Sequence, residues 1–100
     1  MLSFTPRLLQ KGFTKHGADF GLSGSWNGSR AAEFSAAVNQ HINSAGVQAI
    51  MGKYRGEQVT HYLNRQTGLN VIADSAGNYV SGWQLSAEQL ASVLSNGRLF

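Results

Sequence analysis

Residues 47–84 read VQAIMGKYRGEQVTHYLNRQTGLNVIADSAGNYVSGWQ, and the pattern of this segment indicates a β-sheet. Apolar and polar residues alternate with a period of two in four short segments, which is typical of β-strands. The connections between the segments contain glycine and are too short for a crossover between parallel strands. We therefore predict four strands in an antiparallel meander, at residues 47–51, 58–63, 69–73 and 78–84.

Helix signals precede this stretch. Thr5 can cap a first helix that begins at Pro6 and ends near His16. Ser29 is a good N-cap for a second helix, in which apolar residues recur at three- and four-residue steps. Gly46 stands where a left-handed cap would end that helix. We therefore expect two helices before the sheet.

A third helix follows the sheet. Residues 86–89, Ser-Ala-Glu-Gln, form a capping-box pattern, and Gly97 stands where this helix would end. We predict an α+β fold in which helices cover one face of a four-stranded antiparallel sheet. The chain has 100 residues, 42% of them hydrophobic. This is enough for one domain over residues 1–100, with a core of about residues 8–97.

Composition narrows the function classes. The chain has no cysteine, which excludes a disulfide scaffold and thiolate metal sites. Its apolar runs are only a few residues long, so we expect no membrane span. The net charge is +3, and the excess lies in residues 1–55, which hold six Lys and Arg against two carboxylates. A basic half in a small domain is compatible with a polyanionic partner.

Lys11, Lys15 and His16 are the first candidates for chemistry. The i,i+4 spacing puts the two lysines on one helix face, and His16 follows at the helix end. Histidine can serve as an acid or a base near neutral pH. The alternative is that this cationic last turn only complements the helix dipole.

The last predicted strand holds a second cluster. Regular alternation would place Tyr79, Ser81 and Trp83 on one face of the sheet. Aromatic side chains exposed on a sheet serve as stacking platforms for bases, whereas the alternative is that Trp83 belongs to the core. Of the other histidines, His41 fits a helix position at the edge of an apolar stripe, and His61 fits packing or a hydrogen bond at the edge of the sheet.

Four strings together resemble a known family. They are KHGADFG (15–21), YRGEQVTHYL (54–63), TGLNV (67–71) and SGWQLS (81–86). In order and spacing, they are similar to the C-terminal tRNase domain family of colicin D, which also occurs in contact-dependent growth-inhibition toxins. The resemblance covers residues 8–97 and implies the small α+β ribonuclease fold of barnase, EndoU and RelE toxins.

The resemblance also implies an activity. It points to an antibacterial toxin domain, an endoribonuclease that needs no metal or other cofactor and cleaves tRNA in the anticodon loop. The 2′-OH would attack the adjacent phosphate and leave a 2′,3′-cyclic phosphate. The family roles fall on His16 as acid and base, Lys15 as stabiliser of the phosphorane, Ser81 as a phosphate ligand and Trp83 as a stacking partner.

Lys11 is a fifth catalytic candidate. The family has a second lysine two residues before the first, where this chain has Phe13, and Lys11 lies two residues further back. Helix geometry keeps Lys11 near Lys15. Four more residues are candidates for substrate binding, with His61 also considered for the second proton transfer: Lys53, Arg55, Tyr79 and His61.

The resemblance implies partners as well. These are a tRNA substrate and a cognate immunity protein, acidic so that it can cover a basic cleft. We expect a monomer or a 1:1 complex, secreted or delivered from a cell surface within a larger toxin and active in the cytoplasm of the target cell. Two other function classes fit the same residues: a non-catalytic RNA-binding module, and a protein-interaction domain without a nucleic-acid role.

Overall fold

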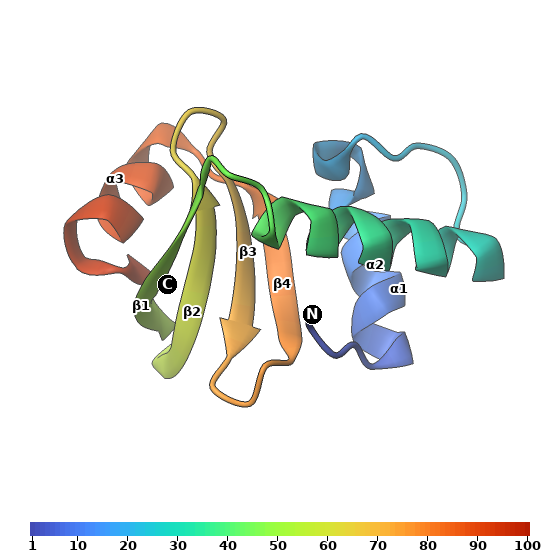
Figure 1. Cartoon of the computed structure of the whole chain (residues 1–100), viewed down its shortest axis with the longest axis horizontal. Helices are drawn as coiled ribbons and strands as arrows, with labels where there is room; N and C mark the ends of the chain where they lie inside the picture. The colour runs from blue at the N-terminus through green and yellow to red at the C-terminus, as the bar shows by residue number, and fades with distance from the viewer.

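A curled five-stranded sheet forms the centre of the computed structural model, which describes residues 1–100 (Figure 1). The strand order is β4-β3-β2-β1-β5. The first four strands form the predicted antiparallel meander, and the short β5 pairs in parallel with β1. The sheet is therefore mixed and has one strand more than the sequence predicted. The strands are β1 (Val47–Tyr54), β2 (Glu57–Asn64), β3 (Leu69–Asp74), β4 (Tyr79–Gln84) and β5 (Arg98–Leu99).

Three α-helices and one 3-10 turn accompany the sheet. They are α1 (Pro6–His16), the turn η1 (Gly17–Phe20), α2 (Gly28–Ile42) and α3 (Ala87–Asn96). Thr5 caps α1, and Ser86 begins α3 in the predicted capping box. The bounds of α2 differ from those expected, because Asn27 rather than Ser29 accepts the first free N–H groups and the helix ends before Gly46. None of the helices has the length and apolar character needed to cross a membrane.

Helices pack against both faces of the sheet, so the prediction of a single covered face is wrong (Figure 1). On one face, Phe34 of α2 packs in a cluster with Val71 and Ala73 of β3. On the other, Val93 of α3 packs in a cluster with Ile72. Because four consecutive residues of β3 are buried, this strand needs cover on both of its faces.

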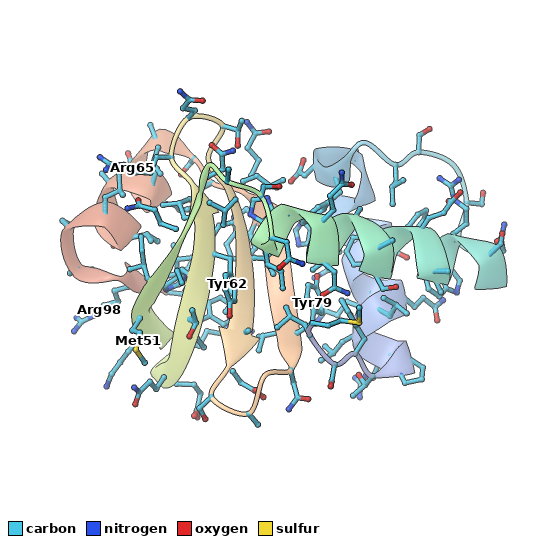
Figure 2. The ribbon with its side chains drawn as sticks, viewed as in Figure 1. Met51, Tyr62, Arg65, Tyr79 and Arg98 are labelled. Carbon is cyan, nitrogen blue, oxygen red and sulfur yellow. The ribbon has the colours of Figure 1, made fainter.

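A β-bulge in β4 changes which side chains share a face. Ser81 pairs with Ile72 and Tyr79 pairs with Ala73, so Val80 is an extra residue on this strand. Tyr79 therefore lies between β4 and the helices α1 and α2 (Figure 2), whereas Ser81 lies on the opposite face. The prediction that Tyr79 shares a face with Ser81 and Trp83 is wrong, because strict alternation has no place for the extra residue.

Candidate active site

A cavity of about 400 Å³ lies where α1 passes the edge strand β4. The end of β1, the first turns of α3 and the residue after β5 complete its walls. Three Lys and Arg side chains line the cavity and no carboxylate does. Such a lining favours an anionic ligand. The lining residues are Leu8, Lys11, Gly12, Lys15, His16, Tyr54, Arg55, Tyr79, Val80, Ser81, Trp83, Gln89 and Phe100.

Helix α1 supplies Lys11, Lys15 and His16 to this cavity. Both lysines are exposed, and they lie one helical turn apart on the same side of the helix. Phe13, at the position of the second family lysine, points the other way and packs in the core against Phe34. A lysine at position 13 would therefore be buried in this chain, and Lys11 is the residue that lines the cavity.

His16 stacks on Trp83 across the cavity. The ring centroids are 5.7 Å apart and the planes are inclined by 29°. Trp83 is itself held, because its indole Nε1–H donates to Oε1 of Gln89 at 3.2 Å. The same oxygen accepts the N–H of Ser86 at 3.0 Å in the capping box of α3. The first turn of α3 thus holds the Trp83 indole, on which the His16 ring stacks.

The turn η1 attaches the end of α1 to β4 beside this stack. Asp19 accepts the backbone N–H of Gln84 through Oδ2 at 2.9 Å. The ring of Phe20 packs closely against Gly82, because a Cβ added at Gly82 would lie 3.2 Å from this ring. Residues on either side of Trp83 are therefore anchored to η1, which directly follows His16. Asp19 is exposed, yet through this bond it positions the histidine.

Burial lowers the pKa of His16 below its ordinary value. The nearby carboxylate of Asp19 opposes this shift and raises the pKa, whereas the charge on Lys15 lowers it further. The net effect favours the neutral imidazole at pH 7, which is the form that can accept a proton.

Replacing Asp19 by Asn should lower the pKa of His16 further. The amide oxygen of asparagine can still accept the Gln84 N–H, so the substitution removes the negative charge while keeping the anchor. An NMR titration of the His16 ring protons in both proteins measures the shift. Glu33→Gln is the matched control, because Glu33 pairs with Arg30 on α2. An unchanged or raised His16 pKa in Asp19→Asn would show that this carboxylate does not act on the histidine.

All five residues with predicted catalytic roles line this one cavity: Lys11, Lys15, His16, Ser81 and Trp83. Arg55 and Tyr79, predicted to bind substrate, also line it. The Tyr79 hydroxyl is buried without a hydrogen-bond partner beside Gly12, and burial raises its pKa far above the ordinary value, so it remains protonated.

Lys53 and His61 do not reach the cavity. His61 is fully buried: its Nε2–H donates to the carbonyl of Gly97 at 2.8 Å, and its Nδ1 accepts from Asn70 at 3.1 Å. Burial lowers its pKa, so the ring stays neutral. The expectation that His61 binds substrate or transfers a proton is corrected, since both ring nitrogens are bonded inside the protein. Lys53 is exposed on β1 and lies outside the lining.

Six lining residues were not predicted as site residues, and three of them carry an aromatic ring or a side-chain amide: Tyr54, Gln89 and Phe100. Tyr54 directly precedes the predicted Arg55, and Gln89 belongs to the predicted capping box. The sequence therefore pointed to both neighbourhoods, but it did not predict that these two side chains line the cavity. No sequence pattern pointed to Phe100, because its position depends on the pairing of β5 with β1. The structure holds no group of three or more His, Cys, Asp or Glu side chains placed to bind a metal ion.

Three comparisons with known proteins each find a related protein or family. The family model described as Colicin D matches residues 8–93. The protein Colicin-D of Escherichia coli is 30% identical over 99 residues, which cover 97% of this chain and 13% of the relative. The chain thus spans about one eighth of that relative. A solved ribonuclease from Escherichia coli, in complex with its inhibitor protein, is 32% identical with a TM-score of 0.79. The match covers 91% of this chain and 99% of the ribonuclease chain.

Proposed function

Because this chain belongs to the colicin D family, we propose that it is the ribonuclease domain of an antibacterial toxin and that it cleaves tRNA. The observation that carries the proposal is the cavity lining, in which three cations, one histidine and several aromatic rings meet without a carboxylate. Phosphates bind to such cations, and bases stack on such rings. The likeness to a solved ribonuclease over nearly its whole chain supports the same activity.

The proposed reaction begins at the ribose 2′-OH beside the scissile phosphate. Neutral His16 accepts the 2′-OH proton as the oxygen forms a bond to phosphorus. The P–O5′ bond then breaks, and the 5′-oxygen takes up the proton from His16, which is neutral again afterwards. The products are a 2′,3′-cyclic phosphate and a 5′-hydroxyl. Because the substrate supplies the nucleophile, the step needs no metal-activated water, and we propose that no cofactor takes part.

The other cavity residues stabilise negative charge on the phosphate and hold the RNA in position. In the transition state, negative charge gathers on the phosphate oxygens, where Lys15 stabilises it and Lys11 adds a second positive charge one turn away. The Ser81 hydroxyl donates a hydrogen bond to the phosphate. Trp83 supports the His16 ring and contacts a flanking base. Arg55 binds the RNA backbone at the rim of the cavity.

The proposed partners follow from the same surface. An immunity protein that blocks the cavity would place carboxylates against Lys11, Lys15 and Arg55, and is therefore acidic. Support comes from the solved ribonuclease, which was captured with an inhibitor protein. Since the chain matches only 13% of the Escherichia coli relative, we propose that it acts as part of a larger secreted or surface-delivered toxin, and in the target-cell cytoplasm.

Incubation with total tRNA in excess EDTA tests the proposed function. We expect discrete fragments from one tRNA or a few isoacceptors, cut in the anticodon loop, with ends mapped at nucleotide resolution. A ribosomal RNA fragment of similar length is the control for general RNA cleavage. If tRNA binds in a salt-dependent way but stays intact, the chain is an RNA-binding module. If it neither binds nor is cut, the chain acts on another partner.

A further inference from the structure

Trp83 has further aromatic neighbours besides His16. Its ring lies 6.2 Å from the ring of Phe100, with planes inclined by 30°. Tyr54 lies 6.0 Å from Trp83 and 6.3 Å from Phe100. Three aromatic rings thus cluster in the wall of the cavity. We infer that Tyr54, Trp83 and Phe100 form a nucleobase subsite that holds the base beside the scissile phosphate. This inference rests on the proposed ribonuclease function.

Phe100 is exposed, but the residue before it is anchored. Phe100 is 72% exposed, whereas Leu99 is buried in the core. The Leu99 carbonyl accepts the N–H of Arg55 at 3.1 Å, which attaches this end of the chain to the β1–β2 turn. A large aromatic ring held at the rim of a cationic cavity can stack on a base without first being ordered.

The polar groups around the rings also fit a base. Gln89 uses its side-chain oxygen for Trp83 and Ser86, which leaves its Nε2 amide free to donate to a base edge. The guanidinium of Arg55 lies 5.2 Å from the centre of the Tyr54 ring, where it can meet a phosphate while the ring stays in place. No Asp or Glu side chain lines the cavity, as a cationic ligand would require.

The rings place the subsite next to the reacting phosphate. His16 stacks on Trp83, and Trp83 in turn is stacked with Phe100, so the aromatic subsite begins one ring away from the acid–base group. A nucleotide whose phosphate reacts at His16 therefore has a neighbouring base within reach of Phe100. Sequence preference at that position would arise from the strength of stacking and from the Gln89 amide.

Single-turnover cleavage of RNA oligonucleotides tests the subsite. Each substrate carries either the natural base or an abasic site at one position flanking the scissile bond. With the wild-type protein, we expect an abasic site at one of these positions to slow cleavage by about 5- to 150-fold. Phe100→Ala should slow cleavage of the natural substrate, and removal of the same base should then cost little more, because the stacking partner is already gone.

Controls separate the subsite from the fold and from the proposed function. Phe100→Trp should restore the dependence on the base. Met51→Ala removes a side chain of similar exposure outside the cavity and should leave cleavage unchanged (Figure 2). If Phe100→Ala and base removal slow cleavage independently at every flanking position, so that their fold-effects multiply, the proposed subsite is wrong. The ribonuclease activity itself would not be affected by that result. If wild-type protein cleaves no RNA, the proposed function fails and the subsite with it.

Discussion

His16→Ala is expected to slow RNA cleavage by about 10²- to 10⁴-fold, the usual contribution of a positioned acid–base group. His16 is the only histidine in the cavity, since His41 and His61 are buried and bonded to backbone carbonyls. Alanine removes the proton acceptor but leaves Lys11 and Lys15 in place, so RNA affinity should change little. Single-turnover rates and binding constants at pH 7 measure both effects.

Lys53→Ala is a suitable control for this prediction. Lys53 is a basic residue of the same small domain, exposed on β1 and outside the cavity, so its loss should leave the cleavage rate near that of the wild type. A His16→Ala protein that is folded and cleaves RNA within threefold of the wild-type rate would remove His16 from the reaction. The proton would then have to be taken by another group.

Gly52→Ala is expected to reduce the free energy of unfolding by about 3 kcal/mol, at the upper end of the usual cost of overpacking. A Cβ at Gly52 would lie 1.9 Å from the carbonyl oxygen of Gly97 and 2.6 Å from its carbon. These are backbone atoms at the junction of α3 and β5, and the oxygen already accepts the Lys53 N–H and bonds to His61. Relief therefore requires β1 and β5 to separate.

Urea denaturation of both proteins measures this loss, which corresponds to roughly 12–24 °C in melting temperature. Gly28→Ala is the matched control, because a Cβ at Gly28, in the first turn of α2, meets nothing within 4 Å. That substitution should leave the stability unchanged or raise it. Equal stabilities for Gly52→Ala and the wild type would mean that β5 does not approach β1 as closely as described.

The elements that were predicted correctly are those that depend on residues close together in the chain. The capping box at Ser86 and the turn-linked strands appear as expected, because caps and tight turns are decided within a few residues. The bulge at Val80, the strand β5 and the cover on both faces of β3 were not predicted. Each of these depends on pairing or packing between segments far apart in the chain.

The candidate site shows the same contrast between residues that a sequence pattern can identify and residues that come together only in the folded chain. The resemblance named His16, Lys15, Ser81 and Trp83, and these residues line one cavity. His61 was misjudged because residue type does not tell which face of β2 it occupies, and that face is covered by α3. Tyr54, Gln89 and Phe100 come from three separate elements and meet only after the sheet has formed, so no local pattern could have joined them.

Attack by the 2′-OH is tested by cleavage, in EDTA, of the mapped RNA substrate with a single 2′-deoxy nucleotide at the scissile position. We expect the all-ribose RNA to yield a 2′,3′-cyclic phosphate and a 5′-hydroxyl, and the deoxy substrate to bind as tightly but stay intact. Cleavage of the deoxy substrate at the same bond, or products carrying a 3′-hydroxyl and a 5′-phosphate, would contradict attack by the 2′-OH at the His16 cavity.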